Sequence, residues 1–300
     1  MQTKQKIRTL LEQAAVSPSQ RRSQNFLIDL NLMSLLVETA DPQPQDLVLE
    51  IGAGTGSLTE ELAKRAGFVI TVEIDKILAA IASRCLKKTK NVQLIAADAL
   101  GNKNTIDKSV IDAIASARGN CPGRFLLVAN LPYSIASPVM INLAIGRPGA
   151  DEMYVTVQRE IAARMTAATG TTDYGILTIL LNAVGKVSII RFLKPGVFWP
   201  RPQVHSAMVA FRRSRQKADR IKDMKIFSSV VNLFMQHRRK MLKACTKFSD
   251  GQLKSIENWK DIFKNSAADP YCRPEQLPPH IFIEIANLCA EQLDKKQNTT

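Results

Sequence analysis

The sequence has few cysteines and histidines, and neither type is grouped. Five cysteines and three histidines occur among 300 residues, and no Cys-x-x-Cys pair is present. Zinc sites and disulfide frameworks both need closely spaced or paired cysteines, so we expect no metal and a reducing compartment. The cysteines are Cys85, Cys121, Cys245, Cys272 and Cys289.

Long apolar runs are also missing. The stretch 176–190 is interrupted by Gly185-Lys186 and is too short to span a bilayer. The amino-terminal segment is basic at positions 4–8, but no apolar core follows, so a secretory signal is not expected. An acid-poor transit peptide stays open as an alternative. These features predict a cytoplasmic protein without a membrane partner.

Acidic residues are outnumbered by basic ones. The chain has 41 Lys and Arg against 27 Asp and Glu, which gives a formal net charge of +14. Such an excess favours a polyanionic partner, and nucleic acid is the usual one. An anionic membrane is the rival, but no strongly basic amphipathic helix with an aromatic apolar face is found. We therefore expect nucleic acid as the partner.

Short apolar runs alternate with helical patterns over the first part of the chain. The strands are expected at 47–51, 68–73, 92–96, 125–129 and 153–157, with helices at 57–65, 75–88 and 105–118. This alternation predicts βαβ units and a parallel sheet covered on both faces. Two later strands, 186–192 and 205–211, follow a helix near 174–184. A proline-rich connection joins them and allows antiparallel pairing at a sheet edge.

The composition changes after Phe211. A charge-rich stretch is followed by helical spacing at 226–234 and 281–288. The predicted division is an α/β domain at residues 1–213, with an amino-terminal helical extension, and a small helical domain at residues 214–300.

A glycine-rich loop follows the first strand directly. Gly52, Gly54 and Gly56 have no Cβ, so the backbone can turn tightly and approach a ligand. The Gly-x-Gly-x-Gly spacing differs from the usual dinucleotide fingerprint and lacks the ending of a phosphate-cradling P-loop. Glu73 ends the second strand, where a carboxylate can accept hydrogen bonds from ribose hydroxyls. Asp98 ends the third strand, within reach of an adenine amino group.

These groups suit a nucleoside ligand without a pyrophosphate, and S-adenosylmethionine is the leading candidate. NAD or FAD is the competing cofactor. The alternative interpretation is structural, with the glycines forming a tight strand-to-helix turn and the two carboxylates standing at solvated strand ends.

The tetrapeptide Asn130-Leu131-Pro132-Tyr133 follows the strand at 125–129. Pro132 stops the strand, so Asn130 is expected at the carboxyl edge of a buried sheet, where α/β folds bind ligands. The Asn130 side-chain carbonyl and a backbone carbonyl beside it suit an exocyclic amino group, and Tyr133 offers a flat face to the attached ring. An ordinary strand-to-loop turn is the alternative.

In this order, the segments resemble the ribosomal RNA adenine dimethyltransferase family, specifically its bacterial small-subunit branch. No single motif is decisive, but the ordered series is specific. One departure is Ser23, where the family usually has glycine. The matching segments are 23–29, 49–56, 72–75, 97–99, 130–133, 157–160, 174–175, 198–204, 234–242 and 273–277.

The resemblance implies a Rossmann-like class I S-adenosylmethionine-dependent methyltransferase with a small helical C-terminal domain that binds RNA or the ribosome. It implies dimethylation of N6 of two adjacent adenosines in a 3′-terminal hairpin of 16S rRNA, linked to small-subunit biogenesis. The partner would be 16S rRNA within the small subunit or its precursor, bound by a monomer. A large-subunit rRNA adenine methyltransferase and a non-catalytic RNA-binding assembly factor are the alternatives.

The resemblance also assigns residues. Phe198 would bracket the target base together with Tyr133, although a phenylalanine is as readily a core residue. The basic run 237–240 would contact RNA phosphates, or would simply form a solvated helix face. The catalytic set is Asn130, Leu131, Pro132, Tyr133 and Phe198. The cofactor set is Asn25, Leu27, Gly52, Gly54, Glu73, Asp98 and Asn130.

Overall fold

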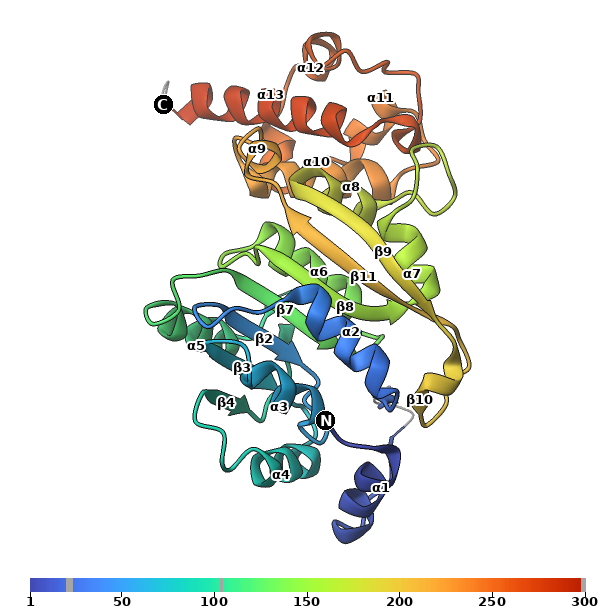
Figure 1. Cartoon of the computed structure of the whole chain (residues 1–300). Coiled ribbons are helices and arrows are strands. Elements are labelled where there is room, and N and C mark those ends of the chain that lie inside the picture. The colour runs from blue at the N-terminus through green and yellow to red at the C-terminus, as the bar shows by residue number, and fades with distance from the viewer. Residues whose placement is uncertain (20–23, 103–104, 298–300) are drawn as a thin grey trace. The chain divides into compact units, whose positions relative to one another are not determined.

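The structure of the protein is a computed structural model that describes residues 1–19, 24–102 and 105–297 (Figure 1). The chain folds into two compact units. Unit 1 comprises Met1–Ala162 and Ser188–Arg212, and unit 2 comprises Ala163–Val187 and the chain from Arg213 onward. The segment 163–187, which the sequence-based division placed in the first domain, belongs to unit 2 because its helix α8 (Ile176–Val184) packs on two later helices.

Unit 1 is built on a seven-stranded sheet with the order β4-β3-β2-β7-β8-β11-β9. The first five strands in this order pair in parallel, and β11 pairs antiparallel with β8. The prediction of a parallel α/β sheet is confirmed, and the two later strands, β11 and β9, are neighbours at one edge of the sheet. The strands are β2 (Leu47–Ile51), β3 (Phe68–Val72), β4 (Val92–Ile95), β7 (Phe125–Asn130), β8 (Glu152–Gln158), β9 (Gly185–Leu193) and β11 (Ser206–Arg213).

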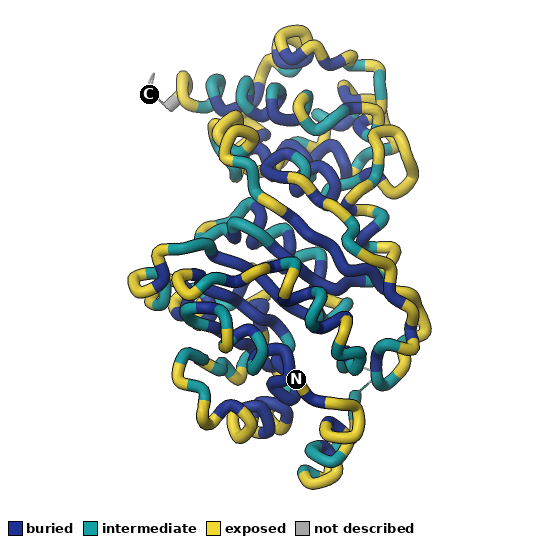
Figure 2. Tube along the Cα trace, viewed as in Figure 1, coloured by how far each residue is buried: buried dark blue, intermediate teal, exposed yellow. Residues whose placement is uncertain are grey.

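Both faces of this sheet are covered. Every residue of β2 is buried, which is the reason for its uninterrupted apolar pattern, and Figure 2 shows the same burial through the central strands. Helices α2 (Leu30–Ala40) and α3 (Ser57–Ala63) share one apolar cluster with Val48 and Leu126. Helix α5 (Lys108–Arg118) packs on β2 and β3.

The order of the strands decides where a ligand can bind. Consecutive strands run outward from β2 in one direction to β4, and the order then reverses to continue from β7 on the other side of β2. Open α/β sheets bind ligands beyond the carboxyl ends of the strands at such a reversal. The Asp75 side chain accepts hydrogen bonds from the backbone N–H groups of Ile77 and Leu78. It therefore caps the start of helix α4 (Lys76–Cys85), directly after β3.

Several short elements were not expected from the sequence. Strand β1 (Phe26–Leu27) pairs antiparallel with β10 (Phe198–Trp199), and two residues are too few to show a periodic pattern. The predicted helix at 105–118 starts only at Lys108, because β6 (Thr105–Ile106) pairs with β5 (Leu100–Asn102). The remaining elements are α1 (Lys4–Gln13), α6 (Ala136–Ile145), α7 (Arg159–Met165) and a 3-10 turn at Pro195–Val197.

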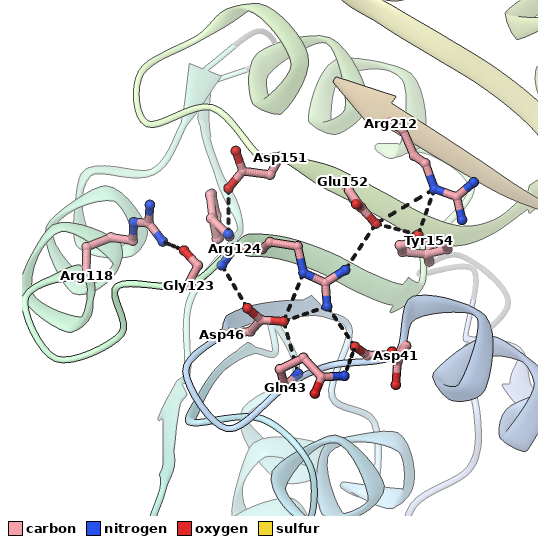
Figure 3. Close-up of polar contacts among 11 residues, drawn as sticks. Asp41, Gln43, Asp46, Arg118, Gly123, Arg124, Asp151, Glu152, Tyr154 and Arg212 are labelled. Carbon is pink, nitrogen blue, oxygen red and sulfur yellow. Dashed lines mark hydrogen bonds and ion pairs between the residues drawn. The ribbon is translucent and has the colours of Figure 1, made fainter. Parts of the chain in front are cut away.

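A polar network joins the amino-terminal ends of β2, β7 and β8 to the carboxyl-terminal end of β11 (Figure 3). The Arg124 guanidinium donates from Nε and Nη2 to Asp46 Oδ2, at 3.1 and 2.7 Å. Its Nη1 lies 3.5 Å from Glu152 Oε2, and Glu152 accepts a hydrogen bond from the Tyr154 hydroxyl. Arg212 donates to the same hydroxyl. The network ties β2, β7, β8 and β11 together at the edge opposite to the switch point.

Unit 2 is organised around three helices that pack on one another: α8, α10 (Met224–Gln236) and α13 (Pro279–Gln297). Phe234 of α10 forms the centre of an aromatic cluster with Trp259, Phe263 and Phe282, at centroid distances of 5.9 to 6.4 Å. The shorter elements are α9 (Arg215–Ala218), α11 (Leu242–Cys245), α12 (Trp259–Asn265) and 3-10 turns at Thr246–Phe248, Gly251–Ser255 and Pro274–Gln276.

Among the described residues, no helix combines the length and the apolar character that a bilayer crossing requires.

Candidate active site

A cavity of about 260 Å³ lies in unit 1 at the carboxyl ends of β2, β3 and β7, on both sides of the point where the strand order reverses. Its walls combine apolar side chains with carboxylates and backbone amides, as ligand sites commonly do. The predicted site residues that line it are Asn25, Leu27, Gly52, Gly54, Glu73, Asp98, Asn130 and Pro132.

The glycine loop forms the floor of this cavity. Gly52, Gly54 and Gly56 have φ values of +91°, +57° and +83°, a region that side-chain-bearing residues rarely adopt. A Cβ on Gly54 would stand 3.0 Å from Phe26 Cε1, too close for both groups to remain in place. The loop therefore requires glycine both for its conformation and for the space beside Phe26.

The Glu73 carboxylate is held in place by the backbone. Its Oε2 accepts a hydrogen bond from Gly54 N–H at 2.8 Å, and its Oε1 accepts one from Asp75 N–H at 2.9 Å. The residue is only 5% exposed. A carboxylate is acceptor-only and has about four lone-pair sites, so it can accept hydrogen bonds from several donors at once. This geometry suits the neighbouring hydroxyls of a ribose.

Asp98 lies at the outer rim of the cavity. Its side chain is exposed, and Oδ1 accepts a hydrogen bond from Leu100 N–H at 2.9 Å. Ile74, beside Glu73, is 51% exposed although it is apolar, and it lines the same cavity. A flat aromatic ring placed against Ile74 would cover this apolar surface and present its polar edge to Asp98. The cavity therefore fits a nucleoside.

The Asn130 amide has a defined orientation at the cavity wall. Its Nδ2 donates to the backbone carbonyl of Asn25 at 2.8 Å, and its Oδ1 accepts a hydrogen bond from the Thr156 hydroxyl. A backbone carbonyl only accepts, so the nitrogen must face Asn25. Oδ1 has a second lone pair, and Asn130 lines the cavity.

Three of the predicted catalytic residues do not line the cavity in the described part of the chain. Leu131 is only 1% exposed. The Tyr133 hydroxyl lies 2.6 Å from Ser206 Oγ, and burial raises the pKa of Tyr133. Phe198 is 2% exposed, pairs with Leu27 and belongs to an apolar cluster. A role for Phe198 in stacking on a base stays a prediction, and it requires β10 to move.

Sequence reasoning missed several residues that support the site. Gln2 is buried against the glycine loop, where its side chain donates to Thr55 O at 3.0 Å and its backbone N–H to Ser57 Oγ at 2.8 Å. Thr156 and Ser206 were not predicted either, although their hydroxyls contact Asn130 Oδ1 and the Tyr133 hydroxyl. Only tertiary contacts reveal these residues, because nothing in their local sequence differs from an ordinary helix start or strand.

The basic run at 237–240 lies in unit 2, in the turn between α10 and α11 and not on a helix face. Arg238 is bound within the unit, since Nη1 donates to the carbonyls of Thr172 and Tyr174 at 3.2 and 3.1 Å. Arg239 and Lys240 are exposed. Ser23, the departure noted above, lies outside the described residues.

Comparison with known proteins identifies the family. A sequence profile described as "Ribosomal RNA adenine dimethylase" matches residues 18–276. That match takes in the glycine loop, Glu73, Asp98, the tetrapeptide and most of unit 2. The chain belongs to the ribosomal RNA adenine dimethylase family. The resemblance carried by the motifs is thereby confirmed.

Two relatives illustrate the similarity. The "Ribosomal RNA small subunit methyltransferase A" of Pelotomaculum thermopropionicum is 34% identical over 281 residues, covering 94% of this chain and 94% of its own. The protein of the same name from Caldanaerobacter subterraneus subsp. tengcongensis is 36% identical over 269 residues, covering 88% of this chain and 94% of its own. Family membership therefore extends over nearly the whole chain.

Two solved structures share the fold. A dimethyladenosine transferase from Plasmodium falciparum superposes with a TM-score of 0.66 at 24% identity, covering 89% of this chain and 96% of its own. The 23S rRNA methyltransferase ErmE superposes with a TM-score of 0.59 at 24% identity, covering 90% and 100%. The predicted Rossmann-like fold of class I methyltransferases is confirmed.

Proposed function

We propose that this protein transfers methyl groups from S-adenosylmethionine to N6 of two adjacent adenosines in a 3′-terminal hairpin of 16S rRNA, as a step in small-subunit biogenesis. Membership of the adenine dimethylase family supports the reaction, and the small-subunit relatives support the substrate. One observation carries the proposal at the level of the site: the Asn130 amide, fixed in orientation, stands at the wall of a cavity that fits a nucleoside.

The cofactor would occupy the cavity between the glycine loop and the ends of β3 and β4. Glu73 would accept hydrogen bonds from the two ribose hydroxyls, and Asp98 would accept one from the adenine amino group. Gly52 and Gly54 allow the backbone to approach the ligand closely. Asn25 and Leu27 also line the cavity. When bound, S-adenosylmethionine supplies an electrophilic methyl group on its sulfonium.

The chain's own contribution to the chemistry is to bind the target nitrogen. The lone pair of adenine N6 is delocalised into the ring, which makes N6 a poor nucleophile. Hydrogen bonds from the amino group to Asn130 Oδ1 and to the Leu131 carbonyl favour a pyramidal nitrogen and stabilise the positive charge that develops on it. Alignment of the nitrogen with the methyl group supplies the remaining advantage. The product cation is acidic, so a strong base is unnecessary.

The target base has to leave its stack to reach this position. Pro132 fixes the turn that aims the Leu131 carbonyl, and Tyr133 and Phe198 would offer aromatic faces to the flipped base. Stacking of this kind is worth about 1–3 kcal/mol per base and would offset the cost of unstacking.

Unit 2 would bind RNA or the ribosome, with the exposed Arg239 and Lys240 contacting phosphates. The net charge of +14 supports a polyanionic partner. We propose that the protein acts as a monomer in the cytoplasm, on 16S rRNA within the small subunit or its precursor.

The runner-up functions predict different substrates. A large-subunit rRNA methyltransferase is suggested by the fold shared with ErmE, but at 24% identity that likeness concerns the fold alone. A non-catalytic assembly factor would not need a cofactor cavity with the Gly52, Glu73 and Asn130 arrangement.

The test offers labelled S-adenosylmethionine and the protein to undermethylated small subunits, to large subunits and to duplex DNA in parallel. The proposal predicts label in small-subunit RNA alone. Label only in large-subunit RNA would favour the first runner-up, and no label in any substrate would favour the binding factor.

A further inference from the structure

Two buried hydroxyls stand on one face of the sheet next to the tetrapeptide. Asn130 of β7 pairs in register with Thr156 of β8, and Thr156 pairs with Met208 of β11. Ser206 precedes Met208 by two positions, and alternate residues of a strand face the same way, so Ser206 shares this face. Thr156 and Ser206 are both 0% exposed. Their neighbours on this face belong to an apolar cluster: Val128, Tyr154, Met208 and Ala210.

A hydroxyl in such surroundings is costly unless it has a hydrogen-bond partner. Thr156 and Ser206 each have one, and both partners belong to the tetrapeptide. Thr156 Oγ1 donates to Asn130 Oδ1, and Ser206 Oγ lies 2.6 Å from the Tyr133 hydroxyl. Both hydroxyls therefore hydrogen-bond to residues of the same turn, Asn130 to Tyr133.

The Thr156 contact acts on the acceptor that faces the target amino group. An asparagine amide can flip by half a turn, exchanging its acceptor for its donor. Asn25 O holds Nδ2 from one side at 2.8 Å, and the Thr156 hydroxyl holds Oδ1 from the other. With both ends held, one lone pair of Oδ1 is used and the other points away from Thr156.

The Ser206 contact acts on the ring. The Tyr133 hydroxyl is anchored at its far end, which limits rotation of the side chain about its bonds to the backbone. Without this anchor the direction of the ring would no longer be fixed at its hydroxyl end.

We propose that Thr156 and Ser206 are positioning residues that fix the Asn130 amide and the Tyr133 ring for methyl transfer. The inference rests on the proposed function, because it assigns Asn130 and Tyr133 to the target base. Both residues are fully buried, and neither is among the described residues that line the cavity. Their contribution is made before the base arrives, because a preorganised acceptor does not have to reorient during the reaction.

The test compares Thr156→Val, which keeps the shape of the side chain and removes the hydroxyl, with Thr156→Ser, which keeps the hydroxyl. We expect Thr156→Val to lower kcat about tenfold while the cofactor Kd changes less than about twofold. Thr156→Ser should restore most of kcat. Ser206→Ala should lower kcat in the same way, with Ser206→Thr as its rescue.

Thr178→Val is the matched control. Thr178 is a buried threonine of unit 2 whose hydroxyl donates to the Arg164 carbonyl. Its replacement should lower the thermal unfolding temperature as much as Thr156→Val without lowering kcat per folded molecule. Wild-type kcat in Thr156→Val, an equal loss in Thr178→Val, or a failure of Thr156→Ser to rescue would each overturn the inference.

A crystal structure of Thr156→Val separates this inference from the proposed function. Positioning predicts that the Asn130 side chain shifts in that variant and keeps its wild-type position in Thr156→Ser, whether or not the substrate is correctly assigned. An unchanged position in Thr156→Val would overturn the inference. An absence of methyl transfer by the wild-type protein would refute the proposed function instead.

Discussion

Glu50 is an ionisable residue that is only 1% exposed and lines the cavity at the carboxyl ends of the strands. Burial raises its pKa from 4.5 to about 8, although the hydroxyls of Thr59 and Thr71 donate to its Oε2 and act in the opposite direction. The folded state keeps the proton that the unfolded state releases above pH 4.5. The free energy of unfolding therefore falls as pH rises from 4.5 to about 8, and this contribution then stays level.

Glu50→Gln should abolish this part of the pH dependence, because the amide does not titrate. Urea unfolding of both proteins between about pH 5 and about pH 8.5 measures the effect. The exposed Glu38→Gln is the control, and it should leave the wild-type slope intact. An equal decline of stability in Glu50→Gln and wild type would show that Glu50 is not the residue responsible.

Gly54 combines a left-handed backbone with close contact to Phe26. Gly54→Ala places a Cβ at φ +57° and 3.0 Å from Phe26 Cε1, and left-handed backbone costs roughly 1–2 kcal/mol for a residue with a side chain. We expect cofactor affinity to fall about tenfold in calorimetric titration. Gly170→Ala is the control, since Gly170 has φ +84° with open space around it. Unchanged affinity in Gly54→Ala would contradict the geometry of the cavity floor.

At the scale of elements, the strands of the sheet are joined at their amino ends by Arg124 (Figure 3). The Asp46 side chain that it binds is only 2% exposed. Arg124 makes its contacts with Asp46, the Asp41 carbonyl and Glu152 from three nitrogens in a planar fork, and the single nitrogen of a lysine does not reproduce that geometry. Arg124→Lys should therefore lower the free energy of unfolding by about 2 kcal/mol, measured by urea titration.

Methyl transfer per folded molecule should stay unchanged in Arg124→Lys, because the network lies at the edge opposite to the cavity. Arg8→Lys is the matched control. Arg8 forms an exposed pair with Glu12, and such pairs contribute little to stability. A loss in Arg124→Lys no larger than that in Arg8→Lys would refute the structural role of the network.

The sequence predicted the long elements well because burial on both faces leaves a strong apolar pattern. The expected strand at 47–51 coincides with β2, and the strand at 153–157 lies inside β8. The β1–β10 pair could not be predicted, since two-residue strands have no periodicity and their pairing is set by tertiary contacts. The predicted helix at 105–118 missed the short β5–β6 hairpin for the same reason.

The candidate site was predictable where its residues follow adjacent strands. Gly52 directly follows β2, Glu73 directly follows β3, and Asn130 is the last residue of β7. Because these strands are parallel, the three residues meet at the same edge of the sheet and line one cavity. Thr156 and Ser206 lie inside strands, where a single polar residue carries no functional signal. Their role depends on register, which one sequence alone does not reveal.

For the whole molecule, the net charge of +14 favours a polyanionic partner. Arg238 is ion-paired with Glu275 at 3.7 Å, whereas Arg239 and Lys240 are exposed in the same turn of unit 2. Replacing Arg239 and Lys240 by glutamine should weaken binding to small subunits. It should also reduce the salt slope by about one for each phosphate that the variant no longer neutralises.

The control for that variant replaces two exposed lysines elsewhere in unit 2, Lys254 and Lys264, by glutamine. Both variants lose the same net charge, so a local role of the turn predicts an effect in the first alone. Equal affinities and salt slopes in the two would show that the turn acts only through overall charge. Binding is measured at several salt concentrations.

The most direct test of the central claim is mass spectrometry of nucleosides from undermethylated small subunits after incubation with S-adenosylmethionine and the protein. Wild-type protein should produce N6,N6-dimethyladenosine at two adjacent positions of 16S rRNA. Asn130→Ala, which removes the acceptor and keeps the glycine loop, should produce none. Undiminished dimethyladenosine with Asn130→Ala, or none with the wild type, would contradict the account.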